Sequence, residues 1–364
     1  MGERPHDTSL PHGAGMPDQR RARRGEMAVC TWIYADSPDE EIQHYQIPGA
    51  SSSDRFQSIY WRCVAVFFAT SYRQQPAARH VLFTNTASLP TVDGVSIAAF
   101  LDSLDVEIVQ LPLTFRTPPD YYHRWRNQFY VFDVAHYLGN HLAASDSAVV
   151  FDSDCVWVAN GEPMHDAIER DGVLTYAVIY DPDWNNNGLS RAEMSEIASA
   201  LGEHPVSYPL MYCGGEIQAA TGVEFARIAR ETSKVWQQLL QRHQNSESVF
   251  FEEGQTLSYV YHRLGYPIGN ANPFMRRIMT GSLGVENNAL YHDRGLVVWH
   301  VPLEKRHGLH RLFADVVREG SVFWRLDPGP ELRRYLGTYL GVPESSVGKR
   351  LRDLTRRLVD KART

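Results

Sequence analysis

The sequence is poor in cysteine and has no long apolar run. Its 364 residues include four cysteines, none of them in a Cys-x-x-Cys pair, so a zinc site of the usual spacing is not expected. Most of these cysteines lie among apolar residues, where buried free thiols are common, and this favours a reducing, cytoplasmic location. No stretch approaches the roughly 18 apolar residues of a membrane-spanning helix. The arginines near the N-terminus are not followed by the apolar segment of a secretory signal.

The sequence also lacks an excess of positive charge. Its 36 Lys and Arg residues stand against 43 Asp and Glu residues, which gives a formal net charge of -7. Proteins whose main partner is nucleic acid usually carry a basic surface, so nucleic acid is not expected as a partner. A small phosphorylated ligand in a local basic pocket is compatible with this composition.

The first 26 residues lack bulky apolar side chains. Residues 1–26 are rich in Gly, Pro, His, Asp and Arg. Such a segment buries too little surface to offset the entropy lost on ordering, so a disordered tail is predicted. Four arginines between residues 20 and 24 are compatible with contact to an anionic surface, although a solvated tail is the more common outcome for such a charge run.

From residue 27 the chain alternates between strand and helix patterns. Strands are predicted at residues 29–34, 80–83, 106–109 and 148–151, and helices at 54–72, 95–104 and 122–142. This alternation predicts an α/β fold of the Rossmann-like type, with a mostly parallel sheet flanked by helices. Ligands of such sheets bind beyond the carboxyl ends of the strands.

The second half of the sequence has a less regular pattern. Strands are predicted at residues 173–179 and 296–301, a tight turn at 212–215, and helices at 190–201, 224–241 and 253–264. The residues after 309 read as basic helices. We therefore predict an α/β domain over residues 27–308 and a helical C-terminal extension over residues 309–364.

The most informative motif is Asp152-Ser153-Asp154, which directly follows the apolar run 148–151. Two carboxylates separated by one residue at the end of a buried strand repel each other unless a cation lies between them. Mg²⁺ and Mn²⁺ prefer carboxylate oxygens and also bridge phosphates. A solvated turn is the alternative, but the apolar flanks favour a divalent metal site.

The segment 151–156 resembles the Asp-x-Asp motif of GT-A glycosyltransferases, and the resemblance extends over about residues 28–305. Four further segments are similar to glycosyltransferase family eight, the group of glycogenin and the bacterial lipopolysaccharide galactosyltransferases. They are Ile33-Tyr-Ala-Asp36 at the end of the first strand, Tyr212-Cys-Gly-Gly215, Glu253-Gly-Gln-Thr-Leu-Ser258, and His300 followed by Lys305.

The resemblance implies a hexosyltransferase-like enzyme that moves a sugar from a nucleoside-diphosphate sugar, with a uridine diphosphate sugar favoured, to a hydroxyl acceptor. It implies a metal site of Asp152, Asp154 and His300 for Mn²⁺ or Mg²⁺. Together with the local patterns, it places Ala35, Asp36, Arg126, Ser153, Gly214, Gly215 and Lys305 at the donor and Glu253 at the reaction centre, as a general base or a sugar-positioning group.

Other functions share this pattern. Gly254 stands where family eight has Gln, which keeps open a nucleotide-sugar-binding protein without catalysis. Phosphatases of the haloacid-dehalogenase type also carry Asp-x-Asp, but on the first strand of their fold, whereas three predicted strands precede it here. A nucleotidyltransferase that uses the same carboxylates is a further alternative.

Overall fold

The computed structural model describes most of the chain. It covers residues 25–41, 47, 49–122, 124, 126–202, 206, 209–281 and 287–362, with side chains up to residue 355 in the last of these segments. The predicted tail at residues 1–26 lies outside the described residues except for its last two. Among the described residues, no helix combines the length and the apolar character needed to cross a membrane.

The centre of the molecule is a six-stranded sheet in the order β5-β2-β1-β6-β9-β8. Its strands are β1 (Met27–Ile33), β2 (Arg79–Thr84), β5 (Val106–Gln110), β6 (Ser147–Phe151), β8 (Val173–Leu174) and β9 (Ile217–Thr221). Strands β5, β2, β1 and β6 run parallel, whereas β9 pairs antiparallel with both β6 and β8. The predicted α/β class with a mostly parallel sheet is therefore confirmed.

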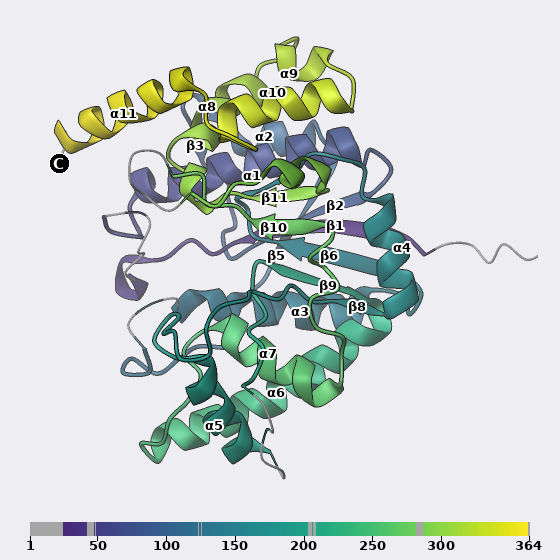
Figure 1. Cartoon of the computed structure of the whole chain (residues 1–364), viewed down its shortest axis with the longest axis vertical. Helices are drawn as coiled ribbons and strands as arrows, with labels where there is room; N and C mark the ends of the chain where they lie inside the picture. The colour runs from purple at the N-terminus through teal and green to yellow at the C-terminus, as the bar shows by residue number, and fades with distance from the viewer. Residues whose placement is uncertain are drawn as a thin grey trace, which may run out of the picture.

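Helices cover both faces of this sheet, which is why β1 and β6 are almost continuously apolar and buried. Val29 of β1 belongs to one apolar core, together with Phe67 of helix α1 (Asp54–Gln74). Its neighbour Cys30 points to the other face and packs in a second core with Phe132 of helix α3 (Tyr130–His141). In Figure 1, α1 lies above the sheet and α3 below it, beside α6 (Gly222–Gln244).

The remaining elements connect these layers or extend them. They are strands β3 (Thr91–Val92) and β4 (Val95–Ser96), helices α2 (Ile97–Asp102), α4 (Glu162–Asp171), α5 (Arg191–Leu201) and α7 (Glu253–Leu264), and the 3-10 helices η1 (Pro38–Glu40), η2 (Arg126–Phe129), η3 (Tyr291–Gly295) and η4 (Pro302–Glu304). Helix α7 has the predicted bounds. Helix α1 begins at the predicted place, but its cap is Ser53, whose hydroxyl accepts a hydrogen bond from Phe56 N at 3.3 Å.

Three predicted helices or strands are clearly shorter than expected. The predicted helix at 95–104 is α2 (Ile97–Asp102), because Val95–Ser96 pairs as β4. The predicted strand at 173–179 pairs with β9 only over Val173–Leu174; beyond it, the side-chain amides of Asn270 and Asn272 take backbone hydrogen bonds of Thr175 and Ala177, and Ala177 forms an isolated bridge with Cys213. The predicted helix at 122–142 is regular only from Tyr130, and η2 precedes it. Strand β9 was not predicted.

A second, three-stranded sheet fixes the loop after β6. Its order is β10 (Met275–Arg277), β11 (Val298–His300) and β7 (Cys155–Trp157). Strand β11 runs antiparallel to β7 and places His300 opposite Cys155, and Val301 N donates to Asp154 O at 3.1 Å. This short ladder places β11 beside the segment that follows Asp152-Ser153-Asp154.

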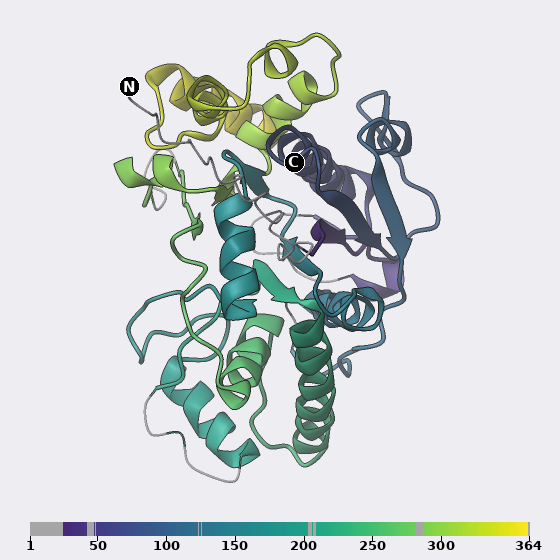
Figure 2. The same ribbon diagram turned by 90° about the vertical axis from the view of Figure 1, so that its right-hand side faces the viewer.

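The residues after 309 form helices, as predicted. They are α8 (Gly308–Val316), α9 (Val322–Arg325), α10 (Pro330–Leu340) and α11 (Val347–Ala362). Helix α8 packs on α1, and α10 packs on α8. Figures 1 and 2 show these helices grouped at one end of the molecule, so this region covers the face of the sheet that α1 occupies.

Candidate metal centre and the cavity around it

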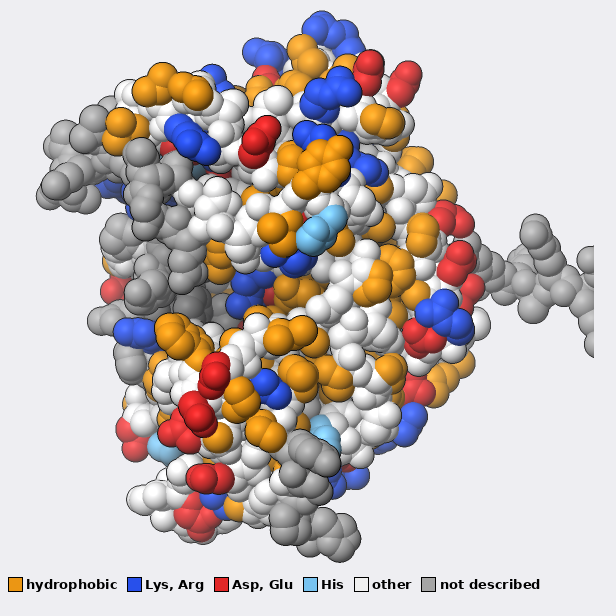
Figure 3. All heavy atoms as spheres, in the orientation of Figure 1, with side chains coloured by type: hydrophobic (Ala, Val, Ile, Leu, Met, Phe, Trp, Pro, Cys, Tyr) orange, Lys and Arg blue, Asp and Glu red, His pale blue; other side chains and the backbone are white. Residues whose placement is uncertain are grey.

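A cavity lies at the carboxyl ends of β1 and β6. Strands β2 and β5 extend the sheet on one side of β1, and β6 lies on the other side, so the strand order reverses at this point. Such a reversal opens a crevice in α/β sheets. The cavity has a volume of about 470 Å³, and Asp36, which follows β1, and Asp152, which follows β6, both line it. Figure 3 shows this side of the molecule hollowed near its centre, with Lys or Arg side chains in the hollow.

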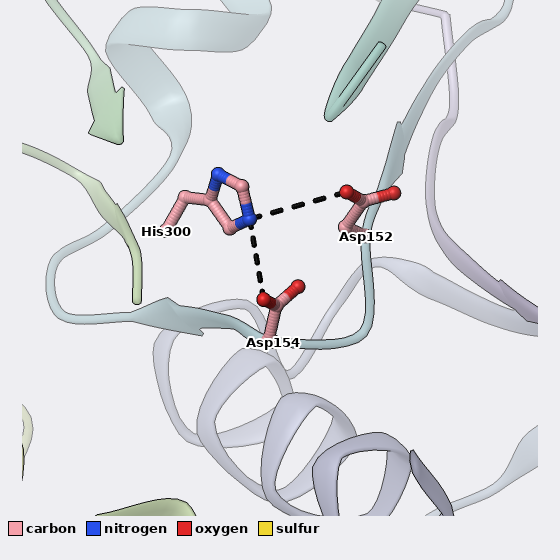
Figure 4. A group of neighbouring side chains, drawn as sticks. All are labelled: Asp152, Asp154 and His300. Carbon is pink, nitrogen blue, oxygen red and sulfur yellow. Dashed lines mark ion pairs between the residues drawn. The ribbon is translucent and has the colours of Figure 1, made fainter. Parts of the chain in front are cut away.

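Three predicted ligands meet in this cavity (Figure 4). Asp152 and Asp154 lie in the turn between β6 and β7, which Cys155 N closes by donating to Asp152 O at 3.1 Å. Nε2 of His300 lies 3.3 Å from Asp154 Oδ2 and 3.9 Å from Asp152 Oδ2. One ligand atom from each residue fits within 4.8 Å of the others, so the group can hold a metal ion. Two carboxylates and an imidazole suit a cation such as Mn²⁺.

Lys305 lies beside the metal group. Its ammonium donates to Oδ2 of Asp154, and both side chains are buried. Burial would raise the pKa of Asp154, but the charges of Lys305 and His300 outweigh it and hold the pKa well below its usual range. Asp154 is therefore ionised at any physiological pH.

Asp152 is less well neutralised than Asp154. Its side chain is 31% exposed, its Oδ2 lies 3.9 Å from His300 Nε2, and the charge of Lys305 acts on it more weakly than that of His300. Burial of the carboxyl and the charge of Asp154 raise the pKa of Asp152 to about 6. An added cation therefore relieves more repulsion at Asp152 than at Asp154.

Glu216 and Arg277 support His300 from behind, and neither was predicted. His300 Nδ1 lies 3.4 Å from Glu216 Oε1, and the Arg277 guanidinium donates to both carboxylate oxygens of Glu216 at 2.8 and 2.7 Å. Burial would lower the pKa of His300, but Asp154 and Glu216 raise it to about 9. A carboxylate on the second imidazole nitrogen orients many metal-binding histidines.

The glycine pair before Glu216 leaves room for carboxylates. A Cβ at Gly214 would meet the carboxylate of Glu216, and a Cβ at Gly215 would meet that of Glu253. Gly215 lines the cavity, whereas Gly214 does not. A glutamate directly after two glycines was thus a usable signal for Glu216.

The opposite wall carries Glu252 and Glu253, at the start of α7. Glu252 accepts hydrogen bonds from the Tyr212 hydroxyl at 2.7 Å and from Asn187 Nδ2 at 2.5 Å. The Gln128 amide, with its nitrogen toward Glu253, donates to Oε2 at 2.8 Å. Burial raises the pKa of Glu252 to about 7, and burial with the charge of Glu252 raises that of Glu253 well above its usual value. Both carboxyls therefore keep their protons to a higher pH than an exposed glutamate does.

Amide side chains surround Asp36 at the far end of the cavity. Its Oδ1 accepts from Asn127 Nδ2 at 2.6 Å, and its backbone oxygen accepts from Gln57 Nε2 at 2.9 Å. Ala35 exchanges backbone hydrogen bonds with the amide of Asn85 at 2.8 and 3.0 Å. Ala35 lines a neighbouring cavity of about 400 Å³, which shares Asp36 and Gln57 with the first.

Most predicted site residues line the main cavity: Asp36, Asp152, Ser153, Asp154, Gly215, Glu253, His300 and Lys305. Ala35, Gly214 and Arg126 do not. The Arg126 guanidinium donates to Thr117 Oγ1 at 3.1 Å, and Arg124 lines the cavity instead. At Arg126 the predicted α-helix is replaced by the 3-10 helix η2.

The comparisons with known proteins identify no family for this chain. No protein-family model matches this chain, and the comparison with curated proteins gives no match. The chemistry of the cavity is therefore argued from its own side chains: one wall of paired charges that can hold a metal ion, and an opposite wall of two glutamates with raised pKa values.

Proposed function

We propose that this chain is a metal-dependent glycosyltransferase. It would move a sugar from a nucleoside-diphosphate sugar, with a uridine diphosphate sugar favoured, to a hydroxyl acceptor. One observation carries the proposal: Asp152, Asp154 and His300 converge from segments 146 residues apart, beside Lys305 and across one cavity from Glu252 and Glu253. This arrangement combines a site for a diphosphate with a site for a hydroxyl group.

The residues present fit a divalent cation. Asp152 keeps an exposed, poorly neutralised carboxylate toward the cavity, and Asp154 is already ionised. Mn²⁺ or Mg²⁺ held by these groups and His300 would neutralise the charge that develops on the diphosphate leaving group. Lys305 adds a second, fixed positive charge beside Asp154.

The end of the cavity near Asp36 suits a nucleoside. Asp36, Asn127 and Gln57 offer a carboxylate and two amides to a base or a ribose, and the side chains of Trp32 and Tyr34 line the same region. These are acceptor and donor groups beside aromatic surfaces, which is the usual composition of a small-ligand pocket.

The two glutamates supply the proton chemistry. Glu252 and Glu253 are adjacent and buried, so the pair loses its two protons in separate steps. When one of the two is ionised, the pair can take the proton of an acceptor hydroxyl, which is general-base catalysis near neutral pH. Glu253 is the proposed base, because the resemblance to family eight puts it at the reaction centre and because Glu252 accepts from two side chains, Tyr212 and Asn187, whereas Glu253 accepts from the Gln128 amide.

The departure at Gly254 has a structural compensation. A Cβ at Gly254 would lie 2.7 Å from the Tyr212 hydroxyl oxygen, so tyrosine fills the space of a side chain at this position. The same hydroxyl donates to Glu252. A polar group is therefore retained at the glutamate wall, which supports an enzyme over a binding protein without catalysis.

The decisive experiment measures nucleoside diphosphate released from a panel of nucleotide sugars, with and without Mn²⁺. Release should require the metal, and Asp154→Asn should reduce it roughly a hundred- to a thousandfold. Asp133→Asn is the matched control, because Asp133 is a buried aspartate that accepts from Thr114 N at 2.9 Å and does not line the cavity.

The outcomes separate the alternatives. Binding of a nucleotide sugar in calorimetry without release from any donor identifies a binding protein. Inorganic phosphate as the product identifies a phosphatase. Either result, or release that is the same in the presence of a chelator, overturns the proposal.

A further inference from the structure

Helix α11 contacts the rest of the protein through charged side chains. Lys349 is fully buried, and its ammonium donates to Glu304 Oε1 and Asp353 Oδ2, each at 2.7 Å. Asp353 also accepts from Arg311 Nη1 of α8 at 2.8 Å. Lys349 and Asp353 are one helical turn apart, so this ion network fixes which face of α11 is turned inward.

The outward face of α11 is apolar. Val347, Leu351 and Leu354 are 73%, 60% and 37% exposed, and their spacing of four and three residues places them on one stripe. The sequence continues this spacing at position 358 with another leucine. Helices on a protein surface normally bury the apolar stripe and expose the charges, whereas α11 does the reverse. Figure 1 shows α11 projecting from the edge of the C-terminal helices.

The charge of α11 is opposite to that of the whole chain. Residues 347–362 contain six Lys or Arg and two Asp, a formal charge of 6 − 2 = +4, while the whole chain carries -7. Arg350 and Arg352, on either side of Leu351, are exposed. An apolar stripe flanked by arginines matches the interface of a bilayer that contains anionic lipids.

We propose that α11 binds the surface of a membrane with anionic lipids, lying in the interface with Val347, Leu351 and Leu354 toward the acyl chains. The buried network of Lys349, Glu304 and Asp353 holds the helix in this orientation. The proposal is independent of the reaction in the cavity, because it uses none of the cavity residues.

A second copy of the chain fits this surface less well. Two α11 helices packed through their apolar stripes would bring two segments of charge +4 together, and like charges across an interface oppose association. Anionic head groups supply the complementary charge. Lipid binding should therefore weaken with salt, because the attraction between exposed charges is screened.

The test is co-sedimentation of the full chain with two vesicle types, pure phosphatidylcholine and an equal mixture with phosphatidylglycerol. The wild-type chain should bind the mixed vesicles and release them at high salt. The double substitution Leu351→Ser with Leu354→Ser should weaken partitioning roughly a hundredfold. Val223→Ser is the matched control, an exposed residue of α6 with 48% exposure.

A charge reversal tests the electrostatic attraction between the arginines of α11 and the anionic lipids. Arg350→Glu with Arg352→Glu should abolish the preference for phosphatidylglycerol, whereas Arg170→Glu, an exposed arginine of α4, should not. Unchanged thermal melting of each variant shows that the fold is intact. Equal sedimentation of the wild type and the leucine variant overturns the proposal. So does a wild-type dimer in analytical ultracentrifugation that the leucine substitutions dissociate, since the apolar stripe then binds a second copy.

Discussion

On one wall of the cavity each buried carboxylate meets a cation, whereas on the other wall two carboxyls meet each other. Asp154 contacts Lys305 and His300, and its pKa lies well below its usual range. Glu252 accepts hydrogen bonds from the neutral side chains of Tyr212 and Asn187, and Glu253 accepts from the amide of Gln128; the pKa values of both glutamates are raised, chiefly by burial. Asp154 and the two glutamates are all buried, so the cations beside Asp154 account for the opposite direction of its pKa shift.

On the proposed function, this difference gives the two walls separate tasks. The wall of Asp152, Asp154, His300 and Lys305 suits a metal ion, which its carboxylates would hold, and a diphosphate, whose charge the metal ion and Lys305 would neutralise. A wall whose carboxyls change protonation near neutral pH suits proton transfer, and environments that push pKa values apart mark such divisions of labour in enzymes. Substitutions on either wall can test this difference.

The largest effect is expected at Glu253. Glu253→Gln keeps the shape of the side chain but cannot accept a proton, so turnover should fall roughly a hundred- to ten-thousandfold while donor affinity stays within about threefold. Glu252→Gln is the matched neighbour, and it should mainly lower thermal stability, because it disturbs the hydrogen bonds to Tyr212 and Asn187. Equal losses of turnover in the two variants would show that the pair acts only through structure.

A smaller effect is expected at His300. His300→Ala should weaken Mn²⁺ binding in calorimetry roughly ten- to a hundredfold. Because a metal-bound imidazole must be neutral and the pKa of His300 is about 9, Mn²⁺ affinity should rise with pH up to about pH 9. His165→Ala, at a buried histidine of α4 that does not line the cavity, is the control. An affinity that is flat above pH 7 contradicts the ion network around His300.

The smallest effect concerns stability and pH. The pKa of Glu252 is about 7 in the folded protein and near 4.5 in an unfolded chain, so the folded state holds this proton more tightly. The stabilisation is complete below about pH 4.5 and is lost as the pH rises through 7, by roughly 1–3 kcal/mol. Denaturant unfolding of the metal-free protein should show this decline between pH 5 and 7. Glu252→Gln should flatten the curve, whereas Glu196→Gln, at an exposed residue of α5, should leave it unchanged.

The sequence predicted those elements that carry their own pattern. Strands β1 and β6 are nearly continuous apolar runs because both faces of the sheet are covered, and β2 has the apolar run Val-Leu-Phe, so these strands could be predicted from the sequence. Strand β9, with the sequence Ile-Gln-Ala-Ala-Thr, has no such run, and it is a strand because it pairs with β6. Its antiparallel direction depends on contacts that no local pattern contains.

The residues of the candidate site also differ in whether a local sequence pattern reveals them. Asp152 and Asp154 are visible as a local motif, and His300 and Lys305 entered through a family resemblance. Glu216 and Arg277 are 61 residues apart and form one pair, so neither is informative alone. Arg126 was expected at the donor, but it lies in a 3-10 turn outside the cavity, and Arg124 lines the cavity instead.

The pairing of β7 with β11 has a consequence for the nascent chain. The ladder places His300 opposite Cys155, so the metal group is assembled from two ends of a long stretch of polypeptide. When a ribosome has released β1 through β6, the carboxylates of Asp152 and Asp154 are present without His300 or Lys305. Domains emerge N-terminal part first. If the proposed metal site is correct, its full ligand set becomes available only after residue 300 has been synthesised, so metal binding by the complete group would follow the synthesis of nearly the whole α/β domain.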